Sequence, residues 1–248
     1  MGETVLDYEA EAAHYDRTRG GVPRAEAAAR AVLSLVPPGA RTLLDLACGT
    51  GLVTERLARP GLNVYGADAA HAMLRAAAGR VPGRTVRADA RRLPLADACV
   101  DAVSAVWLLH LVPFAPDIVA EAARVLRPGG VLVATVDKDA AHDVGSDIDD
   151  VLRPLRSAAP ASDRADLITG HAAAHGLDPA PGTRFTGHGQ GATPRATASK
   201  LRAGYFASWF DGDAATTETL AAALTALPDQ DHPRPDPRYR LAAFVKRA

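Results

Sequence analysis

The stretch RTLLDLACGTGLVTERL, residues 41–57, combines a short apolar run, a glycine turn and the start of a helix. The apolar run, Thr42–Leu46, contains Asp45 and predicts a buried strand, and residues 52–58 have the pattern of a helix. The glycines of the turn Cys48-Gly49-Thr50-Gly51 let the backbone approach a bound molecule, and the start of a helix presents N–H groups to it. The stretch therefore predicts a site for a nucleotide-like ligand.

Strands and helices alternate along most of the chain. Further strands are predicted at residues 63–67, 85–88, 100–106, 131–136, 184–188 and 239–245. Helices are predicted at residues 23–35, 71–78, 116–126, 197–210 and 214–227, one or two more lie in 152–175, and the proline-rich residues 228–237 form a loop. This alternation is typical of a parallel sheet covered by helices on both faces, which binds ligands outside the carboxyl ends of its strands.

Length and composition restrict the class of protein. The chain has 248 residues, of which 48% are hydrophobic, enough for one domain with a substantial core. Its net charge of -1 provides no field that attracts nucleic acid or an anionic membrane. Cys48 and Cys99 cannot form a disulfide framework, and neither a signal peptide nor a membrane-spanning run is recognisable. We expect a cytoplasmic monomer or homodimer with no nucleic-acid or membrane partner.

Residues 137–150 are rich in aspartate and include His142. Their spacing does not match any recognisable set of metal ligands. The segment is therefore interpreted as a solvated loop leading into a helix, and no metal is expected.

Acidic side chains follow each of the first three predicted strands. Asp45 lies near the end of the first strand, Asp68 ends the second and Asp89 ends the third, while Trp107 and His110 follow the fourth. Because the strands are parallel, these residues converge on one edge of the sheet. A nicotinamide dinucleotide is disfavoured because the third glycine of its turn is replaced by threonine. Acids that can bind ribose hydroxyls and an adenine amino group indicate a nucleoside with a cationic, amino-acid-bearing substituent.

Five segments, in order, resemble the motifs of class I S-adenosylmethionine-dependent methyltransferases. They are residues 44–51, 65–68 with 73–74, 87–90 with 93–94, 100–103, and 121–130. The sequence is most similar to the type 11 or type 25 small-molecule enzymes, closely over residues 8–137 and more loosely over 200–209 and 227–244. The resemblance implies an α/β fold with a Rossmann-like, seven-stranded, mostly parallel sheet, helices on both faces, an antiparallel last strand and helical lid elements.

The resemblance also implies one methyltransferase domain over residues 1–248. Within it, residues 1–36 would form an N-terminal helical arm or lid, and residues 37–137 the cofactor-binding core. Residues 138–248 would supply the substrate-side helices and the terminal strands.

Each motif residue acquires an implied role at a site for S-adenosylmethionine. Asp45 would fix the amino group of the cofactor, and Asp68 would bind the ribose hydroxyls. Asp89 and the backbone of Ala90 would meet adenine, against which Met73 would pack. The other implied contacts are Tyr15 and Arg19 of an arm that closes over the cofactor, the turn residues Ala47, Cys48, Gly49 and Gly51, and Ala69, Val106 and Trp107.

Methyl transfer is an in-line displacement that depends on holding the nucleophile and the sulfonium in a near-attack geometry. A base is needed only when the acceptor is protonated. His110 is the first candidate because it follows the fourth strand and imidazole titrates near neutrality. Tyr15 is the second catalytic candidate, and His14, His142 and His188 are weaker ones.

Several of these residues also have structural interpretations. His110 can simply bind the backbone, and Met73 can belong to the core. Cys48 is interpreted as a packing residue and Asp101 as a structural strand residue. The aromatic residues in 205–210 either cap an apolar acceptor or belong to the core.

The expected function is methyl transfer from S-adenosylmethionine to an oxygen, nitrogen or carbon of a small molecule, in bacterial secondary metabolism. Two alternatives stay open: the fold catalyses a non-methylating step such as cyclisation, or it serves as a non-catalytic cofactor-binding partner protein. The sequence does not identify the acceptor.

Overall fold

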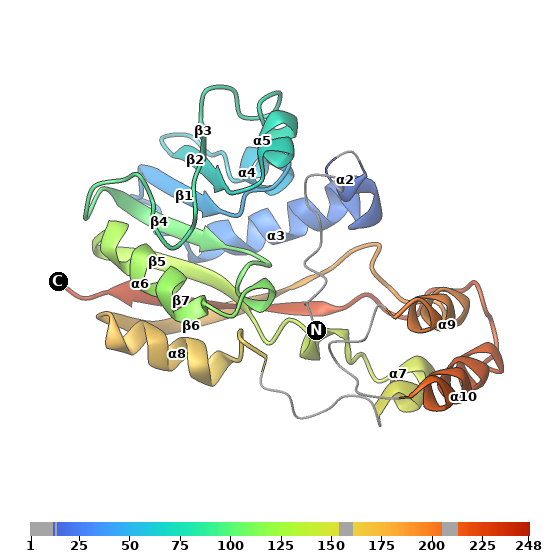
Figure 1. The fold of residues 1–248 in the computed structure, drawn as a ribbon. Coiled ribbons are helices and arrows are strands. Elements are labelled where there is room, and N and C mark those ends of the chain that lie inside the picture. The colour runs from blue at the N-terminus through green and yellow to red at the C-terminus, as the bar shows by residue number, and fades with distance from the viewer. Residues whose placement is uncertain (1–11, 13, 154–160, 205–212) are drawn as a thin grey trace.

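Seven strands form one mixed sheet within the part of the chain that the computed structural model describes, residues 12, 14–153, 161–204 and 213–248 (Figure 1). The order across the sheet is β3-β2-β1-β4-β5-β7-β6. The strands are β1 (Thr42–Leu46), β2 (Asn63–Asp68), β3 (Thr85–Arg87), β4 (Val100–Ala105), β5 (Leu126–Val136), β6 (Leu177–Thr186) and β7 (Arg238–Lys246). The first five run parallel, and β7 lies antiparallel between β5 and β6. The predicted fold class is confirmed.

Helices cover both faces of the sheet (Figure 1). On one face, α3 (Gly21–Leu35) and α4 (Leu52–Arg56) pack over a core that includes Leu43. On the other, α6 (Ala115–Val125) and α8 (Ala165–Ala174) cover a core that includes Leu44. This alternation explains why the strands are apolar throughout, since both faces are buried.

The other helical segments extend or flank these two layers. They are α2 (Tyr15–Thr18), α5 (His71–Ala77), α7 (Asp147–Leu152), α9 (Pro194–Arg202), α10 (Ala214–Thr225) and the 3-10 turns η1 (Leu109–Leu111) and η2 (Ala140–His142). Among the described helices, none has the length and apolar character needed to cross a membrane.

The strand order reverses between β1 and β4, which are neighbours in the sheet although β2 and β3 separate them in the chain. A reversal of this kind opens a crevice outside the carboxyl ends of the strands. The glycine turn follows β1 and Trp107 follows β4. The topology therefore places both at the mouth of this crevice.

Three helices, α7, α9 and α10, form a small lobe with its own apolar cluster. Its buried side chains are Ile148, Leu152, Ala198, Leu201, Ala221 and Leu224. Figure 1 shows the lobe on the same side of the sheet as α2, the side to which the parallel strands point. The aspartate-rich segment supplies the start of α7, where Ser146 and Asp149 form a capping box. This agrees with the predicted loop and helix start, and no metal-binding group of three or more His, Cys, Asp or Glu occurs in the described residues.

Several predicted boundaries are wrong. β5 begins at Leu126 instead of 131, because a register shift against β4 carries the strand through the sequence Arg127-Pro128-Gly129-Gly130. β3 ends at Arg87, so Asp89 lies beyond the strand. The sixth strand starts at Leu177, well before the predicted 184. The helix predicted over 197–210 is α9, which ends at Arg202, and its aromatic residues 205–210 lie outside the described residues.

Candidate active site

The turn after β1 has an unusual backbone. Ala47, Gly49 and Gly51 all have positive φ angles, 53°, 55° and 77°. A side chain with a Cβ tolerates this region poorly, so Ala47 is held there by its surroundings. The Cys48 N–H donates to the Ala67 carbonyl at 3.1 Å, which fastens the turn to β2. Gly66 is essential to this approach, because a Cβ there would lie 2.7 Å from Cys48 Sγ.

Asp68 joins the end of β2 to the glycine turn. One carboxylate oxygen accepts the Gly49 N–H at 2.8 Å, and the other accepts the Ala70 N–H at 2.9 Å. Asp68 also lines the cavity described below. Two backbone donors therefore fix the orientation of this carboxylate at the mouth of the crevice.

Asp45 is buried, with only 3% of its surface exposed. Its two oxygens accept hydrogen bonds of 2.7 Å from the hydroxyls of Thr54 and Ser104. Burial raises the pKa of this carboxyl to about 6, against the lowering effect of those two hydroxyls. Asp45 thus connects β1 to α4 and β4 while it lines the cavity, and its hydroxyl partners were not predicted.

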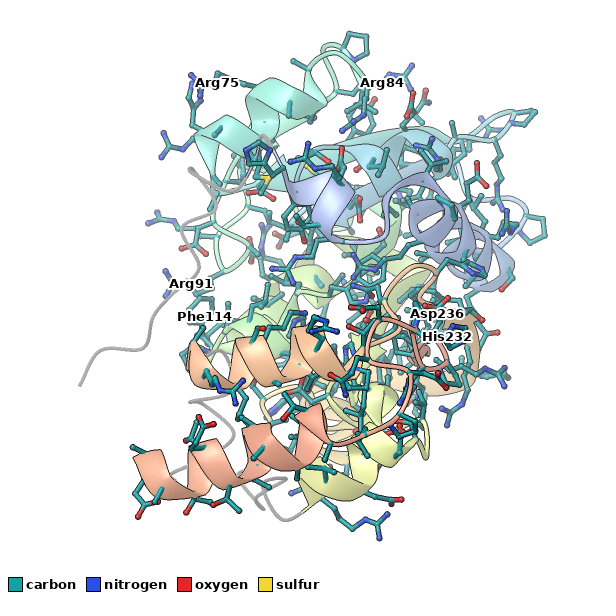
Figure 2. All side chains as sticks on the ribbon, turned by 90° about the vertical axis from the view of Figure 1, so that its right-hand side faces the viewer. Arg75, Arg84, Arg91, Phe114, His232 and Asp236 are labelled. Atoms are coloured by element: carbon teal, nitrogen blue, oxygen red, sulfur yellow. The ribbon has the colours of Figure 1, made fainter. Side chains whose placement is uncertain are left out.

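Asp89 is engaged by Arg91. The guanidinium of Arg91 donates hydrogen bonds of 2.6 and 3.0 Å to the carboxylate, and these hydrogen bonds lower the pKa of Asp89. The same guanidinium lies 4.2 Å from the ring centroid of Phe114. Figure 2 shows Arg91 and Phe114 beside one another. All three residues line the cavity, and neither Arg91 nor Phe114 was predicted.

The short helix α2 is attached to the glycine turn. Asp16 accepts a 2.6 Å hydrogen bond from the Thr50 hydroxyl and a 2.7 Å charged hydrogen bond from Arg80. Arg80 also donates to the Thr50 carbonyl at 2.7 Å. Tyr15 and Arg19, on either side of Asp16 in the chain, line the cavity.

Aromatic rings and a buried arginine close the end of the cavity beyond β4. Trp107 has a φ of 57° and donates its backbone N–H to Thr135 Oγ1 at 3.1 Å. Its ring makes edge contacts with Phe185 and Tyr239, with both centroid distances at 5.5 Å. The guanidinium of Arg24 lies 3.4 Å from the centroid of Trp107. Arg24 was not predicted, although a charge on the alanine-rich apolar face of α3 was a signal for it.

His110 does not suit the predicted role of general base. Its ring lies outside the set of cavity-lining residues, and its buried Nδ1 has no hydrogen-bond partner among the described residues. Burial, reinforced by the positive charges of Lys138 and Arg24, lowers its pKa to about 3. A base this weak accepts a proton poorly at neutral pH. His14, His142 and His188 also lie outside the lining.

Together these residues enclose one cavity of about 410 Å³, within the usual range for small-molecule sites. Of the predicted site residues, only Gly51 and His110 are not part of its lining. Those that line it are Tyr15, Arg19, Asp45, Ala47, Cys48, Gly49, Asp68, Ala69, Met73, Asp89, Ala90, Val106 and Trp107. Gly51 has a packing role, because a Cβ there would lie 3.1 Å from the Cβ of Ala77. Burial raises the pKa of the Cys48 thiol, in keeping with a packing residue.

Similarity to known proteins is concentrated in the same part of the chain. A family described as a methyltransferase domain matches residues 44–134. The ubiquinone/menaquinone biosynthesis C-methyltransferase UbiE of Acidiphilium cryptum is 43% identical over 107 residues, covering 40% of this chain and 43% of that protein. An uncharacterized methyltransferase of Mycobacterium tuberculosis is 39% identical over 129 residues, covering 51% of this chain and 50% of that protein. These matches therefore span half or less of the curated relatives' length.

The solved structure of the (4+2)-cyclase SpnF has the same fold, with a TM-score of 0.61 at 20% identity, covering 98% of this chain and 95% of that one. Residues 44–134 therefore match a methyltransferase domain, and the chain has the fold of the class I methyltransferases. The matched methyltransferase domain indicates S-adenosylmethionine as the cofactor. Sheets of this topology bind ligands at the crevice outside the carboxyl ends of their strands.

The residues of the methyltransferase cavity fit this cofactor. At one end, the carboxylates of Asp45 and Asp68 suit an ammonium group and a pair of ribose hydroxyls. Gly49 leaves room beside them, since a Cβ there would meet nothing closer than Met73 Sδ at 4.0 Å. Met73 offers an apolar surface for a base, and Arg19 at the arm offers a positive charge.

Proposed function

We propose that the chain transfers the methyl group of S-adenosylmethionine to a small-molecule acceptor. The observation that carries this proposal is the Asp68 carboxylate, which the N–H groups of Gly49 and Ala70 hold at the cavity edge. In that orientation it can accept hydrogen bonds from two adjacent ribose hydroxyls. We assign ribose binding to Asp68, amino-group binding to Asp45 and adenine contact to Met73.

The remaining predicted contacts are part of the proposal. Asp89 and Ala90 would flank the adenine edge. When the base binds, Asp89 would accept a hydrogen bond from it, either in place of the hydrogen bonds from Arg91 or in addition to them. Tyr15 and Arg19 would close over the cofactor because Asp16 holds their segment on the turn. Ala47, Cys48 and Ala69 would supply backbone contacts.

When bound, the cofactor supplies an electrophilic methyl group on its sulfonium. The chain then has to hold the acceptor atom in line and keep water out. Val106 and Trp107, at the end of β4, are the proposed walls of the reacting centre. Tyr15 is the proposed catalytic contact for the acceptor, since it lines the cavity while His110 does not.

We further propose that the three parts of the single domain share this work. Residues up to 36 would form the lid, residues 37–137 the cofactor-binding core, and residues 138–248 the acceptor side. The position of α7, α9 and α10 beside the edge where the strands end supports this division (Figure 1). A cytoplasmic role in bacterial secondary metabolism completes the proposal.

Calorimetry with S-adenosylmethionine and S-adenosylhomocysteine tests the proposal directly. Binding of both is expected, and binding of neither would refute it. Incubation of the protein with methyl-labelled cofactor and extracts of small molecules should then give a labelled product. Binding without label transfer would favour a cyclising enzyme, for which the shared fold of the SpnF cyclase gives precedent, or a non-catalytic binding partner.

A further inference from the structure

Arg24 is a buried cation in the wall of the cavity. It lies in the first turns of α3, is only 8% exposed, and lines the cavity together with Trp107. Its guanidinium stacks 3.4 Å from the Trp107 ring centroid and lies 5.8 Å from that of Tyr239. The aromatic faces thus hold the guanidinium plane in one orientation.

Arg24 has no carboxylate partner among the described residues, since no salt bridge between them includes it. One Nη donates to the Arg19 carbonyl at 2.9 Å, and the buried Nε has no hydrogen-bond partner there. Burial lowers the pKa of Arg24, against the raising effect of its neighbours Tyr239 and Tyr15, the first of which also hydrogen-bonds its side chain. None of these neighbours is an aspartate or glutamate.

A guanidinium in this position is costly unless something else binds it. Burying a charge without an ionic partner is unfavourable, and stacking against an aromatic ring offsets only part of that cost. The planar fork of arginine matches a carboxylate through two parallel N–H bonds. An anion entering the cavity would therefore give an acceptor to Nε, which has none among the described residues.

The surroundings of Arg24 favour the acceptor over the cofactor as the source of that anion. The rings beside it belong to Trp107, which follows β4, and to Tyr239 on β7, whereas the carboxylates proposed to bind the cofactor lie at or just beyond the ends of β1, β2 and β3. The adjacent wall is apolar, formed by Val106, Leu108, Leu111 and Val112. A single arginine beside an apolar wall suits one monovalent carboxylate on a flat apolar body better than a divalent phosphate.

We propose that Arg24 binds a carboxylate of the acceptor, so that the substrate class is apolar or aromatic carboxylic acids. This inference rests on the proposed methyl transfer. The carboxylate serves as a recognition group that places the acceptor against Trp107. Arg24 is accordingly a specificity-determining residue.

Calorimetry on protein saturated with S-adenosylhomocysteine tests this pairing. The probes are benzoate, 4-hydroxybenzoate and trans-cinnamate, each compared with its primary amide, which has nearly the same shape without the charge. At least one carboxylate should bind about tenfold or more tightly than its amide, the scale of a charge-assisted hydrogen bond. Arg24→Gln should abolish this preference, and Arg24→Lys should keep part of it. Equal binding of acids and amides to the wild-type protein would overturn the inference.

Arg30→Gln is the matched control, because Arg30 lies on the same helix with a side chain that is 70% exposed. It should leave the preference intact. The affinity of Arg24→Gln for S-adenosylhomocysteine alone should equal that of the wild type. A loss of that affinity would assign Arg24 to the carboxylate of the cofactor and overturn the inference. Failure of the wild-type protein to bind S-adenosylhomocysteine would instead refute the proposed function.

Discussion

The Asp16 carboxylate accepts a hydrogen bond of 2.6 Å from the Thr50 hydroxyl, which joins the N-terminal arm to the glycine turn. Arg80 strengthens the connection, since it binds both the Asp16 carboxylate and the Thr50 carbonyl. The side chains of Asp16 and Arg80 are 27% and 31% exposed, so solvent only partly screens the pair. These contacts hold the segment around Asp16 against the glycine turn without any contribution from a ligand.

Asp16→Ala should weaken S-adenosylhomocysteine binding by about 1–2 kcal/mol, roughly 5–30-fold, because the arm loses its attachment. Calorimetry measures the change. Thr50→Val should have a smaller effect, and the double variant should fall short of the sum because the two residues share one hydrogen bond. Asp166→Asn, at an exposed pair on α8, is the control. Unchanged affinity in Asp16→Ala would contradict a lid role for the arm.

Asp68→Ala should weaken S-adenosylhomocysteine binding by roughly 1–3 kcal/mol, the cost of leaving ribose hydroxyls without an acceptor. The variant also frees the Gly49 and Ala70 N–H groups, so affinity alone does not isolate the ribose contact. Adenosine and 2′,3′-dideoxyadenosine separate the two effects. The wild-type protein should prefer adenosine, and Asp68→Ala should bind both nucleosides equally. A preference that survives in the variant would refute the ribose assignment.

The order of the elements was predictable from the sequence because buried parallel strands are continuous apolar runs. β1 was predicted without error, and β2 and β4 to within one residue. The strand-end acids were predictable for the same reason, since parallel strands bring their ends together. The start of β5 was not predictable, because a sequence with Pro128 and two glycines is typical of a turn. The strand continues through this sequence because it pairs with β4.

The contacts that set the chemistry of each side chain were not predictable. Arg24 contacts Trp107 across a large separation in sequence, and the pKa of His110 is lowered by burial and then by the charge of Lys138 from another segment. Asp101 is an instructive contrast. Its structural role was predicted, and its carboxylate accepts the N–H groups of Arg41 and Thr42 at 2.9 Å each.

Gly51→Ala should destabilise the protein more than Gly61→Ala. Both glycines have a positive φ, 77° and 79°, so both substitutions carry the same backbone strain. A Cβ at position 51 would lie 3.1 Å from Ala77 Cβ, whereas position 61 has no atom within 4 Å. Urea unfolding should show an extra loss of about 1–3 kcal/mol for Gly51→Ala, the scale of overpacking. Equal stability of the two variants would contradict a packing role for Gly51.

In the His110→Gln variant, the free energy of unfolding should depend less on pH below about 6.5 than it does in the wild type. The variant should retain methyl transfer. Between pH 6.5 and about 3 the unfolded chain binds a proton at His110 that the folded chain does not, so acidification through this window favours unfolding. The wild-type slope should exceed that of the variant by up to about 1.4 kcal/mol per pH unit. Asp45 acts with the opposite sign, because its raised pKa of about 6 makes the folded chain bind the extra proton.

Comparison of wild type with variant removes the contribution of Asp45, which both proteins share. Urea unfolding at several pH values from 7 down to 4.5 provides the slopes, and His175→Gln, which removes an exposed histidine, is the control for losing an imidazole. Parallel slopes for wild type and His110→Gln would show that the ring titrates normally in the folded protein. In that case His110 would regain its place as a candidate base, because a normal imidazole pKa lies close to the pH at which a base works best.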